Sequence, residues 1–213
     1  MTELRPWERG DHEARWNGYF INPDATVLRN LLGVEDALVL ADAENDLVEY
    51  RIAELRELPG LVRRSFDLLH LQALHRQLFQ DVYEWAGELR TVGLAKGGGE
   101  SFVPPASIWM PVDHVAQRVR ESDYLRSMTT DELVLEVAYL YDYLNYAHPF
   151  REGNGRTQRE FFSQLLAKSG RSLDWRLIGM GELHGACHTA RNDGDLELLV
   201  RVIHAVLVDR AEN

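Results

Sequence analysis

One run of the chain, from His148 to Arg159, brings together the residue types that phosphate chemistry requires. It reads HPFREGNGRTQR and contains a histidine, a carboxylate, a Gly-Asn-Gly turn and three arginines. A histidine can act as a base, a carboxylate can hold a cation, and guanidinium groups form paired hydrogen bonds with phosphate oxygens. The run therefore predicts an enzyme that holds the phosphates of a nucleotide and transfers part of that nucleotide.

His148 is the candidate general base, because an imidazole with a pKa of about 6.5 can take a proton from an attacking hydroxyl. Pro149 disfavours the right-handed helical conformation of the preceding residue, so the imidazole is expected to project from a loop. Phe150 is predicted to enter the core and anchor that loop. Glu152 is best explained as a Mg²⁺ ligand, since Mg²⁺ is commonly held by a carboxylate together with substrate phosphates. Taken singly, His148 could be a solvated loop histidine and Glu152 could simply pair with Arg151.

The residues after Glu152 predict a phosphate-binding turn. Gly153 and Gly155 permit positive φ, so the N–H groups around Asn154 can converge on an anion. A helix that begins at Gly155 or Arg156 would add its free N–H groups and the positive end of its dipole. Arg156 and Arg159 are three residues apart and would share one helix face. The alternative for Gly-Asn-Gly is an ordinary turn.

Two well-marked helices must position this run. Thr129 and Glu132 form a capping box, and an apolar stripe follows at spacings of four, three and four, namely Leu133, Val137, Leu140 and Leu144. This helix is predicted to end at Pro149. A second helix, which starts after Gly155, is predicted to stop at Gly170 as a C-cap. The candidate catalytic run is therefore the turn between two helices.

The rest of the chain is also mostly helical in pattern. Further helices are predicted over about Val34 to Leu58, from Ser65 as N-cap through Leu78, from Pro111 to about Leu125, around 177–190, and over 195–209 with Asp195 as cap. Residues 1–30 are predicted to be irregular, with aromatic side chains that dock onto the body. Residues 89–94 and 101–103, separated by Gly97-Gly98-Gly99, read as a β-hairpin. The predicted fold class is all-α with one short hairpin flap, in a single domain over 1–213.

Composition and charge exclude several classes of protein. The chain has 213 residues, 45% of them hydrophobic, which is enough for a folded domain with a core. It has no apolar run long enough to span a membrane and no secretory signal at residues 1–10. Cys187 is the only cysteine, which excludes an internal disulfide and fits a reducing cytoplasm. A net charge of −11 argues against direct binding of nucleic acid, although acidity alone also aids solubility.

The run 148–159 resembles the signature of the Fic (filamentation induced by cyclic AMP) family, H-x-F-x-[D/E]-G-N-G-R-x-x-R, at every specified position. The resemblance covers about residues 65–205, with residues 1–60 as an N-terminal extension and first helix before a core over 61–205. Enzymes of this kind transfer AMP from ATP to a hydroxyl of a target protein and release pyrophosphate. The resemblance thus implies a Fic-type helical fold, ATP as substrate and Mg²⁺ as cofactor.

The resemblance also implies a role for each residue of the run. His148 would be the general base, Glu152 the Mg²⁺ ligand, Asn154 with the Gly153 and Gly155 amides the cradle of the α- and β-phosphates, Arg156 the β-phosphate contact and Arg159 the γ-phosphate contact. Related Doc-type phosphotransferases carry Lys in place of Gly155 and lack the second arginine, so this run favours adenylyl transfer. The flap over 91–103, with Lys96, Gly97 and Gly98 at its tip, would align the target segment as an added strand. The target would supply a Tyr, Ser or Thr hydroxyl.

Many Fic enzymes are inhibited by a helix with the motif [S/T]-x-x-x-E-[G/N], whose glutamate pairs with the second arginine. No Ser or Thr of this chain has Glu four residues later; the nearest match, Thr189 to Gly194, has Asp193 in that place and is interpreted as a helix end. The resemblance is therefore to the class of bacterial toxins inhibited by a small helical antitoxin that carries this motif. Toxins of that class modify type II topoisomerases, which are candidate targets by analogy alone.

Two alternatives remain open. A Fic-fold enzyme that transfers another nucleotide or phosphate-containing group would share this pocket. A non-catalytic nucleotide-binding module is the other, although the intact motif favours an enzyme. His184, Cys187 and His188 have a spacing that suggests a metal site, but Gly185 replaces the glutamate of a zincin helix and no third ligand is obvious. We interpret that cluster as structural.

Overall fold

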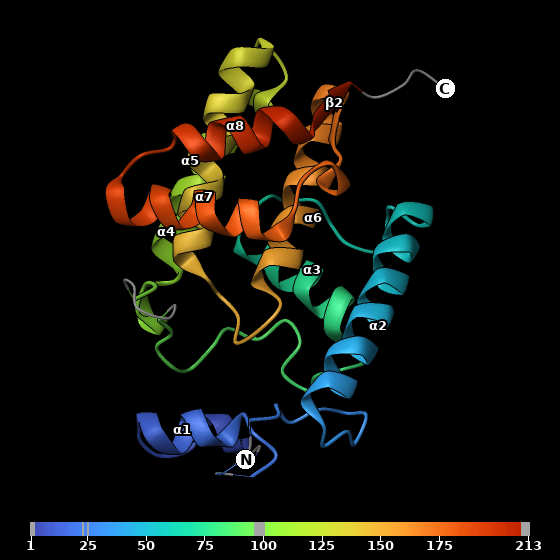
Figure 1. The fold of residues 1–213 in the computed structure, drawn as a ribbon, viewed down its shortest axis with the longest axis vertical. Coiled ribbons are helices and arrows are strands. Elements are labelled where there is room, and N and C mark those ends of the chain that lie inside the picture. Colours follow the sequence, from blue (N-terminus) through green and yellow to red (C-terminus); the bar gives the residue numbers. More distant parts are fainter. Residues whose placement is uncertain (1–2, 23, 25, 96–100, 210–213) are drawn as a thin grey trace.

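The computed structural model describes residues 3–22, 24, 26–95 and 101–209, and these form a helical body (Figure 1). The helices are α1 (His12–Gly18), α2 (Ala37–Glu57), α3 (Leu68–Phe79), α4 (Trp109–Glu121), α5 (Thr130–Ala147), α6 (Asn154–Leu166), α7 (Met180–Asp193) and α8 (Glu197–Val206). Short 3-10 turns lie at Pro6–Glu8, Pro105–Ser107, Asp123–Leu125, Ala167–Ser169 and Trp175–Leu177. The all-α fold class is confirmed. None of the helices described is long and apolar enough to cross a membrane.

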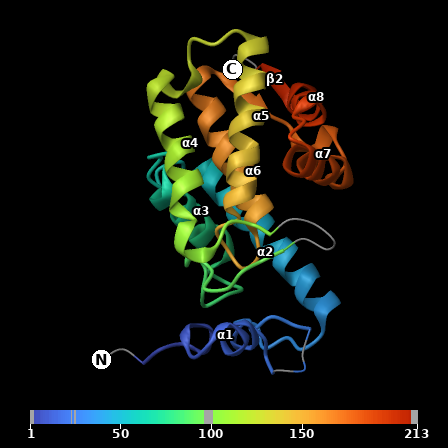
Figure 2. The same ribbon diagram turned by 90° about the vertical axis from the view of Figure 1, so that its left-hand side faces the viewer.

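The helix α5 lies at the centre of this body. It packs against α4, α6, α7 and α8, and α3 packs against α6. Figure 2 shows α4, α5 and α6 side by side with their axes roughly upright, and α7 and α8 beside α5. Because α5 and α6 are both surrounded, their apolar faces are buried, and the loop that joins them is fixed at both ends.

The sequence signals that begin and end α5 act as predicted. The Thr129 hydroxyl accepts a hydrogen bond from the Glu132 N–H at 3.4 Å, and the Glu132 carboxylate accepts one from the Thr129 N–H at 2.9 Å. Leu133, one residue of the predicted stripe, is fully buried. The helix ends at Ala147, and His148 takes the left-handed conformation with φ 39° and ψ 59°. Pro149 follows and disfavours a right-handed helical conformation at His148.

The start of α6 depends on Gly153. This residue has φ +78°, and a Cβ atom at this position would lie 2.3 Å from the ring of Phe79. Any side chain here would therefore clash as well as strain the backbone. The helix begins at Asn154, slightly earlier than the sequence predicts. A 3-10 turn continues it to Ser169, and Gly170, with φ +72°, ends this helical region. Of the two glycines in the turn, only Gly153 uses a positive φ.

Several predicted elements need correction. Residues 12–18 form α1, with Asp11 as N-cap, although residues 1–30 were expected to be irregular. The expected docking of N-terminal aromatic residues is present, since Trp7 and Tyr19 are buried. The N-cap of α3 is Asp67 rather than Ser65: the Asp67 carboxylate accepts the His70 N–H at 3.0 Å. Ser65 lies two residues earlier, and its hydroxyl donates to the Asp67 carboxylate at 2.6 Å instead of capping the helix.

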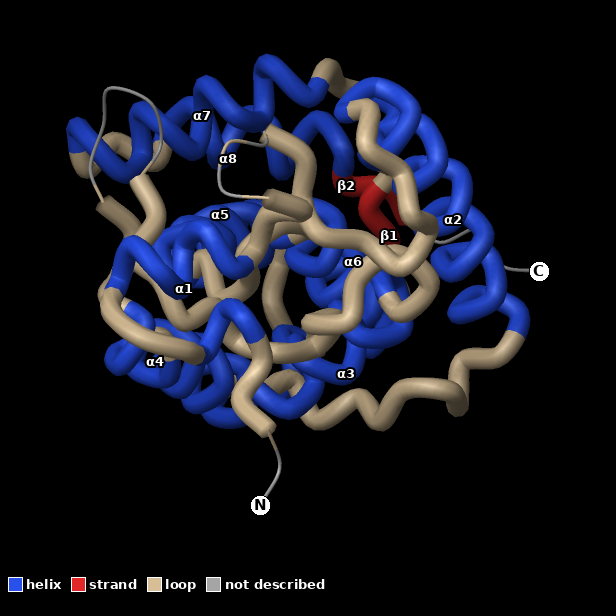
Figure 3. Tube along the Cα trace, turned by 90° about the horizontal axis from the view of Figure 1, so that it is seen from below, coloured by secondary structure: helices blue, strands red, loops and turns tan. Residues whose placement is uncertain are grey.

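The strands also differ from the prediction. The one strand pair that the structure describes is antiparallel and joins β1 (Arg171–Leu173) to β2 (Leu207–Asp209). Strand β2 occupies the end of the helix that the sequence predicts over 195–209. The expected flap exists as a narrower pairing: Ala95 and Ser101 form an isolated bridge, and the Phe102 N–H donates to the Leu94 carbonyl at 3.0 Å. The predicted tip residues Lys96, Gly97 and Gly98 lie outside the described residues. Figure 3 views the molecule from the α1 end, where loops cover the helix ends.

Candidate active site

The loop between α5 and α6 carries the candidate catalytic run and lies at the end of the helices nearest α1 (Figure 1). At its start, the ring of His148 stacks on the ring of Phe102, with centroids 3.8 Å apart and planes 12° apart. Phe102 belongs to the return segment of the flap. The candidate base is therefore in direct contact with the segment expected to receive the target protein.

A buried arginine joins the base of the flap to the end of α5. Arg90 is 2% exposed and donates to the backbone carbonyls of His148 at 2.7 Å and of Ala147 at 3.3 Å. The same guanidinium donates to the carbonyls of Val92 and Val103, one on each side of the flap. Burial lowers the pKa of Arg90 to about 10, so it remains a cation at neutral pH. Arg90 is not among the site residues predicted from the sequence, although a lone arginine in the short segment 89–94 could have indicated a buried structural cation.

A buried histidine supports the middle of the loop. His75, on α3, donates from Nε2 to the Glu152 carbonyl at 3.0 Å and accepts the Gly87 N–H at Nδ1 at 2.8 Å. Its ring stacks on Phe150 with centroids 3.9 Å apart, and Phe150 is fully buried. Burial lowers the pKa of His75 to about 3. The imidazole is therefore neutral, which is what one donor and one acceptor nitrogen require.

Asn154 closes the loop on itself. Its side-chain oxygen accepts the Phe150 N–H at 2.8 Å, and its side-chain nitrogen donates to the Phe150 carbonyl at 2.8 Å. The residue is 7% exposed. Because both ends of the amide are bonded within the loop, Asn154 shapes the turn, and its predicted contact with a phosphate stays a prediction. The donors left for an anion are backbone N–H groups of the first turn of α6, which have no carbonyl partner within the helix.

The two arginines of α6 have different surroundings. Arg156 is bonded through Nη2 to the carboxylate of Glu44 and through Nη1 to the Asn45 side-chain oxygen at 3.2 Å, both on α2. Its guanidinium lies over the Phe79 ring, 4.9 Å from the centroid. Glu44 is not among the predicted site residues. It lies 112 residues before Arg156, and no local pattern distinguishes it from the other carboxylates of that helix.

Arg159 is half-buried, and no carboxylate of the described part of the chain lies within ion-pair distance of it. Burial lowers its pKa below the ordinary value, and the nearby charge of Arg156 acts in the same direction. A Cβ atom on Gly155 would lie 3.4 Å from Arg159 Nη1, so Gly155 leaves room for that guanidinium. A bound anion would stabilise the charged form of Arg159, which burial and the charge of Arg156 disfavour.

Glu152 lies at the mouth of the loop, with 47% of its side chain exposed. Its Oε1 accepts the Gly153 N–H at 3.0 Å and is 3.9 Å from Arg156 Nη2. Among the described residues, no group of three His, Cys, Asp or Glu side chains could hold a metal ion without other ligands. A single exposed carboxylate beside a phosphate-binding turn fits Mg²⁺, which takes its remaining ligands from phosphates and water.

Comparison with known proteins identifies this loop. The Fic/DOC family model matches residues 65–166, which include the whole run. The chain is 35% identical over 193 residues to the probable protein adenylyltransferase Fic of Salmonella typhimurium strain LT2, covering 91% of this chain and 94% of that protein. This chain belongs to the Fic/DOC family. The resemblance noted in the sequence is thereby confirmed.

Two other Fic proteins show how widely the likeness extends. The protein adenylyltransferase VbhT of Bartonella schoenbuchensis is 35% identical over 167 residues, which are 78% of this chain but 34% of VbhT. The chain thus spans about a third of the length of that relative. The crystal structure of BepC from Bartonella tribocorum, with bound AMPPNP, superposes with a TM-score of 0.84 at 24% identity, over 89% of this chain and 96% of BepC. That superposition shows a shared Fic fold.

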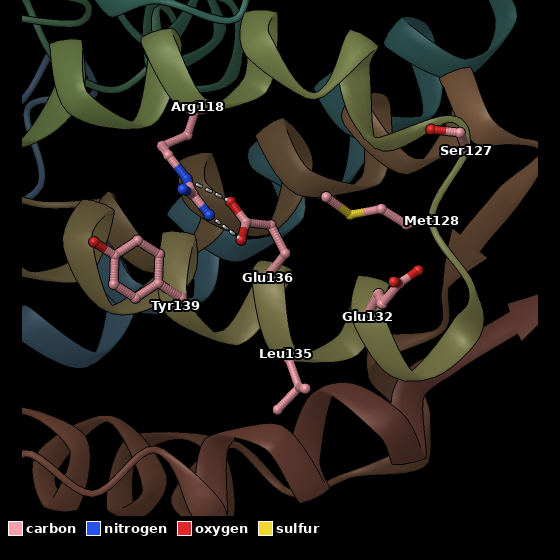
Figure 4. A pocket seen from close by; sticks show the side chains of 7 residues that line it. All are labelled: Arg118, Ser127, Met128, Glu132, Leu135, Glu136 and Tyr139. Atoms are coloured by element: carbon pink, nitrogen blue, oxygen red, sulfur yellow. Dashed lines mark hydrogen bonds and ion pairs between the residues drawn. The ribbon is translucent and has the colours of Figure 1, made fainter.

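Two further features lie near or beyond the Fic loop. Arg151, in the middle of the run, is enclosed by N-terminal rings: its guanidinium is 4.6 Å from Trp16, 5.3 Å from Phe20 and 5.7 Å from Tyr19. It binds the N-terminal segment rather than facing the turn. A cavity of about 620 Å³ lies beside α4 and α5. Figure 4 shows side chains that line it, among them Arg118 and Glu136, which form an ion pair. No residue of the Fic loop lines that cavity, so it is not the candidate active site.

Proposed function

We propose that this protein is a protein adenylyltransferase that transfers AMP from ATP to a hydroxyl side chain of a target protein. The main support is the arrangement of the loop, with His148 against the flap at one end and Arg159 without a carboxylate partner among the described residues at the other. A target hydroxyl and the phosphates of a nucleotide could thus meet at one loop. The names of VbhT and of the Salmonella protein agree with this activity.

In the proposed reaction, the target hydroxyl oxygen forms a bond to the α-phosphorus of ATP. The bond from that phosphorus to the bridging oxygen of the β-phosphate breaks, and pyrophosphate leaves. The hydroxyl proton passes to the imidazole of His148. Arg156 would contact the β-phosphate and Arg159 the γ-phosphate, while the first-turn N–H groups beside Gly153 and Gly155 hold the α- and β-phosphates. Placement of the phosphates thereby decides which phosphorus meets the nucleophile.

Glu152 would hold Mg²⁺. The ion would neutralise negative charge on the phosphates as pyrophosphate departs. The exposed position of Glu152 leaves space for phosphate oxygens and water as the other ligands. Its bond from the Gly153 N–H keeps the carboxylate at the edge of the turn.

The target would bind along the flap. Among the residues described on the two sides of the flap, Ala95 and Ser101 form a bridge and the Phe102 N–H donates to the Leu94 carbonyl, and a target strand would add to an edge of this pair. The hydroxyl to be modified, from Tyr, Ser or Thr, would then arrive beside His148. The proposed role of Lys96, Gly97 and Gly98 in this docking rests on the sequence.

Regulation in trans is the second part of the proposal. Arg159 is the residue where the glutamate of a small helical antitoxin with an [S/T]-x-x-x-E-[G/N] motif would bind. This would make the protein the toxin of a bacterial toxin–antitoxin pair that acts in the cytoplasm, with type II topoisomerases as candidate targets. Affinity purification of the tagged protein from its native host should return a small helical protein, and the Arg159→Ala variant should return less of it. Equal recovery with both proteins would contradict this contact.

The decisive experiment uses purified protein, Mg²⁺ and bacterial lysate, with ATP labelled by ³²P at the α or at the γ position. Label should reach a protein band from the α position alone, and His148→Ala should abolish it while ATP binding persists. His204→Ala, which changes an exposed histidine on α8, is the matched control and should behave as wild type. Label from the γ position would show a kinase instead. Competition by other nucleoside triphosphates would reveal transfer of a different nucleotide.

A further inference from the structure

Arg156, the first of the two arginines on α6, is held by a helix outside the segment that defines the family. Glu44 and Asn45 both lie on α2 and both bond the guanidinium of Arg156. The family model matches only residues 65–166, so neither residue belongs to the signature. We propose that Glu44 and Asn45 are positioning residues that orient Arg156 toward the β-phosphate. This inference rests on the proposed function, because it assumes that the loop binds a nucleoside triphosphate.

The contacts of Glu44 show a prepared site rather than a surface ion pair. Its side chain is 8% exposed, while that of Arg156 is 20% exposed. One carboxylate oxygen of Glu44 bonds Arg156, and the other accepts the hydroxyl of Tyr83, which is itself buried. Burial and the charge of Glu44 raise the pKa of Tyr83, so its hydroxyl keeps the proton that it donates. The Tyr83 hydroxyl therefore fixes one oxygen of the Glu44 carboxylate, and the other oxygen bonds Arg156.

The guanidinium remains able to bind an anion while it is held. Arginine has five N–H donors, and α2 uses one on each terminal nitrogen. The donors that remain can still reach a phosphate at the loop. A free arginine side chain loses rotamer entropy when it binds a ligand, and a guanidinium already fixed by α2 and by the Phe79 ring loses less.

Competition between Glu44 and the phosphate is the opposite hypothesis. A phosphate that pulled Arg156 away would leave the buried Glu44 carboxylate with the Tyr83 hydroxyl as its one bonded partner among the described residues. An uncompensated buried charge is strongly unfavourable. Shared binding of Arg156 by Glu44 and the phosphate avoids that loss, which is why we infer positioning rather than competition.

The test compares Glu44→Ala, Glu44→Gln and Asn45→Ala with wild type. Steady-state AMP transfer gives kcat and KM for ATP, and titration with a fluorescent ATP analogue gives nucleotide affinity directly. Glu44→Ala should raise KM by about tenfold or more, since the arginine is no longer oriented. Glu44→Gln can still accept from Arg156 and should stay within about threefold of wild type. Asn45→Ala removes one exposed contact and should give a smaller rise in KM than Glu44→Ala.

Two controls separate positioning from general damage. Glu54→Ala removes another α2 carboxylate, which pairs with Arg51 at 2.8 Å and does not contact Arg156. It should leave KM unchanged. In an Arg156→Ala background, Glu44→Ala should cause no further loss of ATP affinity, because its effect passes through Arg156.

The outcomes discriminate clearly. Higher activity or tighter nucleotide binding in Glu44→Ala would overturn the proposal in favour of competition. An equal loss with and without Arg156 would overturn it in favour of a structural role. If Glu44→Ala does not fold, the Asn45→Ala and Glu44→Gln results decide alone. Should wild type bind ATP without transferring AMP, the proposed function fails, while the affinity measurements still test Glu44.

Discussion

At the scale of single residues, the Fic loop depends on neutral and buried groups, of which His75 lies outside the signature and Asn154 within it. His75 fixes the Glu152 carbonyl, and Asn154 fixes both backbone groups of Phe150. Each of these contacts uses a group with no net charge, so they add no negative charge that would oppose the positive charge of Arg156, Arg159 and the helix N-terminus. The loop can therefore be rigid without losing its attraction for phosphate.

Protonation of buried histidines should limit stability in acid. Burial lowers the pKa of His75 to about 3 and that of His70 to about 4, against an ordinary value near 6.5. The unfolded chain therefore binds protons more readily, so this part of the stability is complete above pH 6.5 and is lost as the pH falls toward 4. Each histidine should contribute a slope of about 1.4 kcal/mol per pH unit in that window.

Urea unfolding at pH 6.5, 5.5 and 5.0 measures this effect. Carboxylates also titrate there, so the comparison of variants isolates the histidine term. His75→Gln should be less stable than wild type at pH 6.5 but should lose stability less steeply as the pH falls. His204→Gln, at an exposed position, should keep the wild-type slope. Parallel slopes for His75→Gln and wild type would show that His75 is not buried in the neutral form.

The sequence revealed the residues of the loop but not the residues that hold them. His148, Glu152 and the two arginines of α6 are adjacent in sequence, and their chemistry can be read there. Glu44, His75 and Arg90 contact that loop across separations of 112, 77 and 58 residues. Contacts of this kind follow from tertiary packing, and a single sequence carries no local pattern for them.

At the scale of elements, Arg90 couples the flap to α5. Its guanidinium satisfies four carbonyls, two from the flap stem and two from the end of α5. Nothing else described in the structure donates from a side chain to these carbonyls. Arg90 therefore ties the flap stem to the end of α5 and to His148, together with the backbone bond from the Val103 N–H to the Tyr146 carbonyl.

Arg90→Met should uncouple them. Unsatisfied buried carbonyls should lower the free energy of unfolding by about 3 kcal/mol or more. Hydrogen exchange of the Phe102 and Val103 amides should accelerate, and AMP transfer should fall more than ATP affinity, because the flap positions the target. Arg176→Met, which breaks an exposed ion pair, should leave the free energy of unfolding nearly unchanged. Unchanged exchange at Phe102 would contradict the coupling.

Elements were predictable where their signals are local. The capping box of α5 and the glycine that ends the α6 region act within one turn, so the sequence located both. The short helix α1 was missed because its stability comes from docking of neighbouring aromatics such as Trp7 and Tyr19, which are buried. The sequence predicts helix over 207–209 because the apolar pattern of the preceding helix continues into these residues. Strand β2 forms there because β1 offers backbone partners.

At the scale of the whole molecule, the N-terminal residues are part of the active-site architecture. Trp16, Tyr19 and Phe20 enclose Arg151, and Glu44 reaches Arg156 from α2. The three arginines of the run 148–159 thus divide between different contacts. Arg151 contacts the N-terminal aromatic rings, and Arg156 is bonded by α2. In the proposed function, Arg156 also contacts the nucleotide, and Arg159 contacts the nucleotide or an inhibitor.

This division predicts separable effects of Arg151 and Arg159. Arg151→Met removes cation–π contacts worth about 0.5–2 kcal/mol each, so limited proteolysis should cut near α1 sooner and the free energy of unfolding should fall. ATP affinity should change by less than about twofold, because the guanidinium faces the aromatic rings and not the turn.

Arg159→Ala should show the reverse, with unchanged proteolysis and a loss of the preference for ATP over ADP that a γ-phosphate contact confers. Both variants are measured by the same nucleotide titration and the same protease time course. A fall in ATP affinity for Arg151→Met as large as for Arg159→Ala would place Arg151 in the nucleotide site and reject its assignment to the N-terminal segment.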